Sequence, residues 1–541
     1  MIKIVIFFIM ISTIANCNIN RNNQEFFVNK YEKKISSDSA IYLTANYYIS
    51  KGDVYKAREI LRKNINSPKL LQLKFFSNLV SGDFENANKI SILLASDFSE
   101  NNLYYYPQYI INIKKNKFKE NINLLKRGHL NQDLNDLTSL TNLWMSNTQS
   151  KTNFILNDVQ KKISIHELLI LENFYASKKL KKIANQIYET ETLNNNDVLF
   201  LAGFYYRLKD FQKFKSIIQT KLSNQFDKQF IIKNFSLDNN IFYKTPNLHT
   251  ILASKLYNNS ISDNKQNETS YFYKKILLEM SIYLCPTLDI AKYSLAELYN
   301  LEKTNKFALE KLKSISSNSF FFLPSKLKTM SIIKSLNKEN DYKSILFKNF
   351  KIWPKNKYIL YRLASYYKSK KQHNKSIKIY KNILEIYGES NQDLFLYASN
   401  LDKIGKWEEA KTLLLNLLKR NPKDTHTLNY VSYKLALKEQ DLNLAMNFIK
   451  QALTLDPENG FFLDTLGWVE FKRKNYNKAI FFLEKSISIL PRNPEILDHL
   501  GDCYLMLNRK KEAIFEWRKA IKYEIDANTI KIIEAKLKRY E

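Results

Sequence analysis

His166-Glu167 is the part of this sequence that comes nearest to a catalytic motif, because it begins the H-E-x-x-H pattern of zinc metalloproteases. That pattern needs a second histidine one helical turn later, so that both rings reach one zinc ion. Ile170 stands at that position, so the zinc site is absent. The six histidines are scattered without a matching Ser or Cys for nucleophilic catalysis, and no Gly-rich phosphate-binding loop occurs. We therefore expect no catalytic residue, no metal and no cofactor, in a protein that is not an enzyme.

The N-terminus carries the features of a secretion signal. Lys3 supplies a positive charge, Ile4–Ile11 is an apolar core, and Ser12–Cys17 is small and polar. The apolar run is too short to span a bilayer as a permanent anchor. We expect residues 1–17 to direct export to the periplasm or the outer membrane, and the polar residues 18–35 to form a tether.

Cys17 gives this signal a second interpretation. The sequence Ile14-Ala15-Asn16-Cys17 resembles a bacterial lipobox, in which the cysteine becomes a lipidated first residue that tethers the protein to a membrane. Asn16 stands where that motif has Gly, Ala or Ser. Two outcomes therefore stay open, lipidation of Cys17 or cleavage near Ala15 by the ordinary signal peptidase.

One helical hairpin occurs twice between Gly460 and Ile521. Gly467 and Gly501 are 34 positions apart, as are Ala479 and Ala513. Small residues at these places let two antiparallel helices approach closely while larger apolar side chains fill the space between them. The small residue that opens the second helix recurs at Ser376, Ala410, Ala445, Ala479 and Ala513, in steps of 34, 35, 34 and 34. A single hairpin cannot bury its apolar face alone, so this period predicts a continuous stack of helix pairs.

The chain resembles the tetratricopeptide repeat (TPR) family, closely over Tyr358–Tyr523 and loosely over Ser36–Pro354. The runs Asp464-Thr465-Leu466-Gly467-Trp468 and Asp498-His499-Leu500-Gly501-Asp502 are similar to those of exported or envelope-associated bacterial TPR proteins. The resemblance implies an all-α fold, a right-handed α-solenoid of antiparallel helix pairs. It also implies that the first helix of each pair lines a concave groove that holds peptides or proteins. Tyr433 and Glu470 depart from the family pattern, which has Gly and Tyr there, and leave the local curvature undetermined.

In this register, positions 2, 5, 9 and 12 of each first helix face the groove. The predicted groove residues are Tyr358, Tyr361, Phe395, Tyr430, Phe461, Asp464, Trp468, Phe471, Asp498 and Asp502. Aromatic rings beside carboxylates suit an extended peptide that carries apolar and basic side chains. The alternative is that Trp468 and Phe471 pack against the neighbouring repeat, because a tight superhelix covers part of its own groove.

The domain organisation follows from where the repeat pattern is clear and where it fades. We predict a signal at 1–17, a tether at 18–35, divergent hairpins at 36–225, degenerate repeats at 226–355 with a long polar loop at 258–270, a regular TPR array at 356–524 and a capping helix at 525–541. In the capping helix, Ile530, Ile533, Leu537 and Tyr540 share one face, and Lys531, Lys536, Lys538 and Arg539 lie outside it. Cys285 and Cys503 lie many repeats apart, so we expect each to pack as a small apolar side chain without a disulfide.

Composition leaves room for a rival function. Few Gly (9) and Pro (10) favour helices throughout, and Lys+Arg 84 against Asp+Glu 53 gives 84 − 53 = +31. Such an excess suits nucleic acid or anionic lipid, although an AT-rich genome also yields many lysines. The main hypothesis is a non-enzymatic scaffold of the bacterial cell envelope that binds a protein or peptide partner, with the oligomeric state undetermined. The alternatives are a basic solenoid that binds nucleic acid or anionic lipid, the former disfavoured by export, and an accessory subunit of an envelope enzyme complex.

Overall fold

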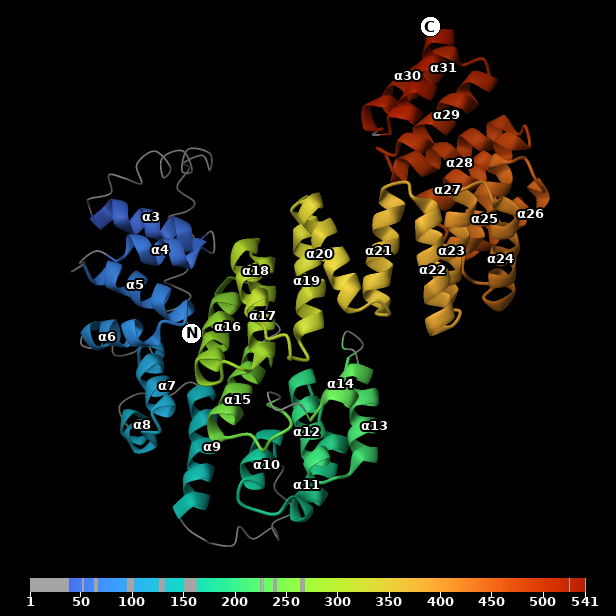
Figure 1. Ribbon diagram of the computed structural model, residues 1–541. Helices are drawn as coiled ribbons and strands as arrows, with labels where there is room; N and C mark the ends of the chain where they lie inside the picture. Colours follow the sequence, from blue (N-terminus) through green and yellow to red (C-terminus); the bar gives the residue numbers. More distant parts are fainter. Residues whose placement is uncertain are drawn as a thin grey trace. The chain divides into compact units, whose positions relative to one another are not determined.

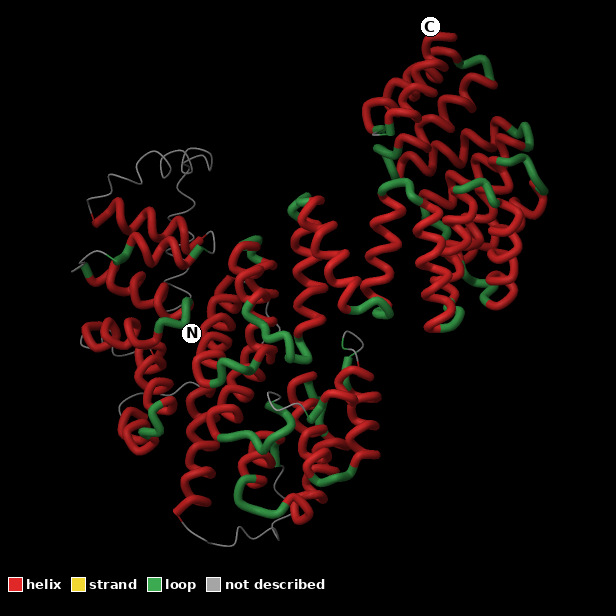
Figure 2. Tube along the Cα trace, viewed as in Figure 1, coloured by secondary structure: helices red, strands yellow, loops and turns green. Residues whose placement is uncertain are grey.

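The computed structural model describes residues 38–50, 53–62, 67–94, 102–125, 132–149, 163–223, 226, 228–236, 241–262, 268–524 and 526–540. These residues form 29 α-helices and one short 3-10 helix, and none of them lies in a β-strand. The chain divides into two compact units, Met1–Tyr342 and Lys343–Glu541, and each is described by itself. The helices pack in successive antiparallel pairs, so the predicted all-α solenoid is confirmed (Figures 1 and 2).

The C-terminal unit is the regular part. Its helices are α21 (Lys357–Ser369), α22 (His373–Tyr387), α23 (Asn391–Lys403), α24 (Trp407–Arg420), α25 (Thr425–Leu437), α26 (Leu442–Leu455), α27 (Gly460–Lys472), α28 (Tyr476–Ile489), α29 (Pro494–Met506), α30 (Lys510–Tyr523) and α31 (Ala527–Tyr540), preceded by α20 (Glu339–Ile352) across the division between the units. Each first helix of a pair begins after a residue whose side chain accepts a hydrogen bond from a backbone N–H of its first turn. These caps are Asn356, Ser390, Asp424, Asn459 and Asn493. The polar residue before each apolar run therefore fixes where the first helix of that pair starts.

Two glycines permit the closest helix contacts of this unit. A Cβ atom on Gly467 would lie 2.7 Å from Cγ of Leu483, and one on Gly501 would lie 2.5 Å from Nε1 of Trp517. Both glycines lie in the first helix of a pair, and the residues they face lie in the second. The prediction that these positions serve helix packing is confirmed.

The last helix, α31, covers the end of the array as predicted, with Ile533 and Leu537 buried. The predicted place of Lys536 was wrong. Its side chain does not lie outside the contact face, because its Nζ atom lies 2.7 Å from carboxylate oxygens of both Asp498 and Asp502. A long lysine can reach across a packed face and pair there, which the helical period alone does not show.

The N-terminal unit is less regular. Its helices are α3 (Asp38–Ser50), α4 (Val54–Ile60), α5 (Pro68–Val80), α6 (Phe84–Leu94), α7 (Tyr106–Lys114), α8 (Phe118–Leu125), α9 (Gln132–Gln149), α10 (Ile165–Glu172), α11 (Ser177–Thr190), α12 (Asn195–Arg207), α13 (Phe211–Lys221), α14 (Lys228–Asn234), α15 (Leu248–Ser262), α16 (Glu268–Leu284), α17 (Asp289–Leu301), α18 (Asn305–Lys313) and α19 (Phe322–Ser335), with the 3-10 helix η2 at Asn102–Tyr105. Helices far apart in sequence pack together here: α15 packs on α9 and α10, and α16 packs on α5 and α7. The α15–α16 hairpin is therefore central to this unit.

The polar stretch 258–270 is shorter as a loop than predicted. Helix α15 continues through Ser262, and α16 begins at Glu268. Asn258 donates to the Asp197 carboxylate at 2.9 Å, and Asn259 donates to Asp133 at 2.6 Å. These amide side chains hydrogen-bond one helix to another. The polar composition of this stretch therefore does not indicate a loop.

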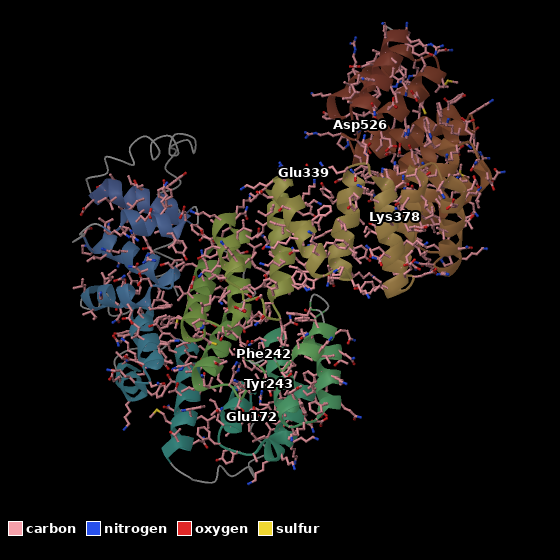
Figure 3. All side chains as sticks on the ribbon, viewed as in Figure 1. Glu172, Phe242, Tyr243, Glu339, Lys378 and Asp526 are labelled. Carbon is pink, nitrogen blue, oxygen red and sulfur yellow. The ribbon has the colours of Figure 1, made fainter. Side chains whose placement is uncertain are left out.

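A half-buried arginine fixes the segment that follows α14. Arg207, at the end of α12, donates to Glu172 at 2.6 Å and to the carbonyl oxygen of Phe242 at 2.8 Å. Figure 3 shows Glu172 near Phe242 and Tyr243. Cβ on Gly203 would lie 2.1 Å from the same Phe242 oxygen, so no larger residue fits where this segment crosses α12.

The two described cysteines behave as predicted. Cys285 and Cys503 are both buried and free of disulfide bonds. Burial raises the pKa of the Cys503 thiol, which keeps it protonated and unreactive.

Candidate protein-binding face of the repeat array

The first helices α21, α23, α25, α27 and α29 form the inner side of the C-terminal array. Helix α25 packs on α27, and α27 packs on α29. The Tyr433 hydroxyl of α25 donates to Glu495 of α29 at 2.5 Å, past the intervening α27. A side chain reaches the next repeat but one only on the inner side of a curved stack. This surface is called the inner face below.

Trp468 and Phe471 lie within this inner face rather than upon it. The Trp468 ring stacks on Phe471 with centroids 4.7 Å apart and on the His499 ring at 4.0 Å. Only 6% of Trp468 is exposed. The geometry therefore matches the alternative in which these two rings pack between repeats.

Asp464 pairs with the same histidine. Its Oδ1 atom lies 2.9 Å from Nδ1 of His499, and both side chains are buried. Burial by itself lowers the pKa of His499, but the Asp464 carboxylate, with Glu495 and Asp498, more than offsets that effect and leaves the pKa raised. The His499 ring therefore carries its proton at a higher pH than a free imidazole and ties α29 to α27.

Asp498 and Asp502 also have partners inside the chain. Lys536 of α31 bridges the two carboxylates, and Trp517 Nε1 donates to Asp502 at 3.2 Å. Burial and the neighbouring Asp498 raise the pKa of Asp502, whereas Lys536 opposes this rise. These carboxylates therefore hold the capping helix in place.

The earlier repeats repeat this arrangement. The Tyr361 hydroxyl donates to Asp393, and the Tyr430 hydroxyl donates to Asp402 at 2.9 Å. The Phe395 and Tyr430 rings meet edge to face, with centroids 5.4 Å apart. A series of charge pairs thus joins successive first helices: Lys357–Asp393 at 3.1 Å, Lys434–Asp402 at 2.7 Å, His499–Asp464 at 2.9 Å and, to the capping helix, Lys536–Asp502 at 2.7 Å.

Phe461 and Tyr358 are the two predicted groove residues that are exposed, whereas the others are half-buried or buried. Each is the second residue of its helix, and 54% of Phe461 and 38% of Tyr358 are exposed. Leu455 and Ile489, the last residues of α26 and α28, are also exposed. The start of α27 lies against the end of α28, because Cβ on Gly460 would lie 3.4 Å from Ile489. Leu455, at the turn into α27, Phe461 and Ile489 are thus three exposed apolar side chains at helix ends beside the start of α27, and together they are called the apolar edge below.

Three residues that matter here were not among the predicted site residues. His499 lies inside a motif that predicts packing, the helical period places Lys536 outside the contact face, and Tyr433 departs from the Gly of the family pattern. The sequence signal that could have pointed to Tyr433 is its departure from Gly, because the hydroxyl of a large polar ring at that position needs a hydrogen-bond partner. The partners, one or two repeats away, follow from the curvature of the stack.

The catalytic fragment His166-Glu167 has a structural explanation. His166 is buried in α10, its Nε2 lies 3.1 Å from Ser254 Oγ, and burial lowers its pKa to about 3. Glu167 completes a capping box with Ser164 at the start of α10. In the described part of the chain, no group of three or more His, Cys, Asp or Glu is placed to hold a metal ion.

The predicted N-terminal signal and Cys17 lie outside the described residues. Among the helices that the structure does describe, none has the length and apolar character needed to cross a bilayer.

Comparisons with known proteins agree with this fold. Models of the tetratricopeptide repeat match residues 358–389 and 394–424, which are α21–α22 and α23–α24 with the start of the next turn. A search of curated protein sequences finds no match.

Solved structures of repeat proteins align with the chain at low scores. A tetratricopeptide repeat protein of Parabacteroides merdae is 15% identical, with 46% of this chain and 97% of that chain covered and a TM-score of 0.40. Yeast Tom70 is 14% identical, with 95% and 96% covered and a TM-score of 0.33. A tetratricopeptide repeat protein of Thermus thermophilus is 19% identical, with 32% and 95% covered and a TM-score of 0.30. At these scores the alignments carry no argument about function.

The stacked helix pairs and their inner face define an α-solenoid. Within that array, the two matched segments, 358–389 and 394–424, are tetratricopeptide repeats. Arrays of this kind are protein-interaction scaffolds in general, because stacking presents an extended surface without a catalytic centre.

Proposed function

We propose that this chain is an exported, non-enzymatic scaffold of the bacterial cell envelope whose C-terminal array binds a protein or peptide partner. The observation that carries the binding role is the apolar edge, Leu455, Phe461 and Ile489. Its side chains stay exposed beside an inner face in which the Trp468, Phe471 and His499 rings are stacked. A partner that covers this edge with apolar side chains removes about 25 cal/mol of unfavourable free energy per Å² of apolar surface.

The partner chemistry differs from the first expectation in one respect. Asp464, Asp498 and Asp502 already have cationic partners inside the chain. A peptide that used them would have to displace those partners and leave buried charges unpaired, which is costly. The proposed partner segment is therefore recognised mainly through apolar side chains, in an extended conformation along the starts of the first helices.

The envelope location is a separate part of the proposal. It is supported by the charge, apolar core and polar end of Met1–Cys17 in the sequence. Mass spectrometry of the mature protein tests it: a first residue near 16 to 18, with or without an acyl group on Cys17, is expected. An intact Met1 in the mature protein would contradict export.

Site-specific photo-crosslinking tests the binding edge. A photoreactive phenylalanine analogue at position 461 is expected to capture a partner in cells. The matched control is position 481, because Phe481 lies on the second helix of the same pair and is 64% exposed. Equal capture of the same partner from both positions, or none from 461, would contradict the proposed edge.

A further inference from the structure

Helices α11 and α13 of the N-terminal unit carry an unusual excess of lysine. Within Ser177–Thr190 and Phe211–Lys221 there are seven lysines and no arginine, against one acidic residue, Glu189. The lysines are Lys178, Lys179, Lys181, Lys182, Lys213, Lys215 and Lys221. The apolar side chains of α11, among them Leu180, Ala184 and Ile187, face the core. The lysines therefore stand on faces that the fold leaves uncovered.

The two helices lie side by side, so their charges form one surface. The Nζ atoms of Lys213 and Lys221 lie 3.7 and 5.0 Å from the centroid of the Tyr188 ring on α11. Lys181 of α11 pairs with Asp210, the residue that caps α13, at 2.9 Å. The other six lysines have no carboxylate oxygen within ion-pair distance among the described residues. None of these six lysines therefore forms an ion pair in this part of the molecule, although the Asp210 carboxylate also acts on Lys213.

The positive charges also act on a neighbouring tyrosine. The pKa of Tyr188 is lowered first by hydrogen bonding to Thr220 and then by the positive charges of Lys213 and Lys221, although partial burial opposes the shift. The lysines of α13 therefore act on a group of α11, as the charges of one surface do.

An exposed aromatic ring adjoins the lysines. Phe211, the first residue of α13, is 48% exposed, and its ring touches Tyr206 at an angle of 78° with centroids 5.3 Å apart. In sequence it follows the cap Asp210 and precedes Lys213 by two residues. An apolar ring beside several lysines is typical of surfaces that rest on a bilayer, where the ring enters the headgroup region.

We propose that the outer surface of α11 and α13 docks on an anionic lipid bilayer. Clusters of four to eight basic residues are attracted to anionic headgroups, at about a factor of five in affinity for each lysine near the surface. Lysine acts as a compact point charge and suits a diffuse field of phosphates. Arginine, which binds single phosphates and base edges as a fork, is absent from both helices. The composition therefore favours a lipid surface over nucleic acid. This docking is independent of the proposed partner edge in the C-terminal array.

Vesicle sedimentation with the full chain tests the proposal. The chain is mixed with phosphatidylcholine vesicles, with or without phosphatidylglycerol, and is expected to bind more strongly when the anionic lipid is present. A lipid on Cys17 would not explain that difference, because an acyl chain enters both vesicle types. Equal binding to the two vesicle types, or a preference for a duplex oligonucleotide over the anionic vesicles, would overturn the proposal.

Charge-matched variants locate the surface. Lys178→Gln with Lys182→Gln and Lys215→Gln should lower the partition onto anionic vesicles about a hundredfold. The control, Lys375→Gln with Lys378→Gln and Lys381→Gln, removes the same charge from α22 of the other unit, where Figure 3 labels Lys378, and should change it little. An equal loss in both variants would overturn the assigned location. Thermal melting by circular dichroism checks that both variants fold.

The aromatic ring gives a second, independent readout. Phe211→Ala should lower binding roughly tenfold, because a buried phenylalanine contributes about that factor. That loss should persist at high salt, whereas the effect of the lysine variant should fade as salt screens the charges. A Phe211→Ala variant that binds as the natural chain does at every salt concentration would contradict insertion of this ring.

Discussion

The two units of this molecule both consist of packed helical hairpins, but they differ in how far apart in sequence the contacting helices lie. In the C-terminal unit, the charge pairs between first helices connect one repeat to the next, as Lys434 with Asp402 or His499 with Asp464. In the N-terminal unit, several partners lie much farther apart in sequence. The Tyr106 hydroxyl lies 2.9 Å from that of Tyr273, and Lys114 donates to the carbonyl oxygen of Leu284 at 2.9 Å.

This difference explains why the repeat pattern is clear in one unit and faint in the other. When each hairpin stacks only on its neighbours, every hairpin meets the same surroundings and the same small and large residues recur. In the N-terminal unit, α16 packs on α5 and α7 as well as on α17. Its side chains must therefore fit several surfaces that differ from one another. Divergence there reflects packing between distant segments rather than loss of the helical hairpins.

The largest expected effect breaks a long-range contact of the N-terminal unit. Gly203→Ala should lower the free energy of unfolding of that unit by about 3 kcal/mol, because the new methyl group would meet the Phe242 carbonyl oxygen. Hydrogen exchange read peptide by peptide should show faster opening around α12 and Phe242. Gly405→Ala is the comparison in the regular unit, since nothing lies within 4 Å of the added methyl group and only its φ of 84° adds strain. An equal loss for both variants would contradict the close approach at Gly203.

The capping helix provides the next test. Lys536→Met should weaken the docking of α31 by roughly 2 to 3 kcal/mol, because Asp498 and Asp502 would repel each other without a cation between them. Hydrogen exchange in Ala527–Tyr540 measures this docking. Lys538→Met, an exposed change on the same helix, is the control and should leave the exchange unaltered.

The buried His499–Asp464 pair predicts how stability depends on pH. The pKa of His499 is raised in the folded chain, so the folded form binds a proton that the unfolded form releases above about pH 6.5. The pair therefore stabilises the C-terminal unit fully below that pH, and the contribution is lost as the pH rises through the raised value. Asp464→Asn should lower the free energy of unfolding by about 2 kcal/mol at low pH, and it should abolish the loss of stability as the pH rises. Chemical denaturation across this range would contradict the assignment if the natural chain showed no more pH dependence than the variant.

The smallest effect is expected at a surface pair of the same unit. Lys371 and Asp526 lie 3.1 Å apart, but their side chains are 76% and 43% exposed. Lys371→Ala should change the free energy of unfolding by only about 0.3 kcal/mol, since exposed pairs are screened by water and salt. A loss near that of Asp464→Asn would show that burial does not decide which pairs matter.

Much of the fold could be predicted from the sequence, because the packing of similar hairpins requires small and large residues at a fixed period. Gly467, Ala479, Gly501 and Ala513 each occupy a place where two helices meet, and their spacing gives the repeat directly. The contacts of α15 and α16 with helices far away in sequence produce no such periodic pattern of residues. Asn258 and Asn259 gave the composition of a loop, although they are helical residues that hydrogen-bond to distant helices.

The candidate site was harder to predict than the fold. Helical register predicts that Asp464 and Asp498 face the groove, but it does not tell whether a binding partner or the chain itself supplies their hydrogen-bond and charge partners. That depends on how tightly the stack curves, as the hydrogen bond from Tyr433 to Glu495 shows. Phe461 differs because it lies at the start of its helix, where no neighbouring repeat covers it.

The affinity of the partner captured at position 461 tests the central claim most directly. Isothermal titration would compare the natural chain with Phe461→Ala and with Phe481→Ala, two exposed phenylalanines of one helix pair. Binding at the apolar edge predicts that Phe461→Ala lowers the affinity for the partner roughly tenfold or more, as expected for an aromatic anchor that is buried in the complex. Phe481→Ala should bind the partner with the affinity of the natural chain. Unchanged affinity for Phe461→Ala, or an equal loss for Phe481→Ala, would contradict it.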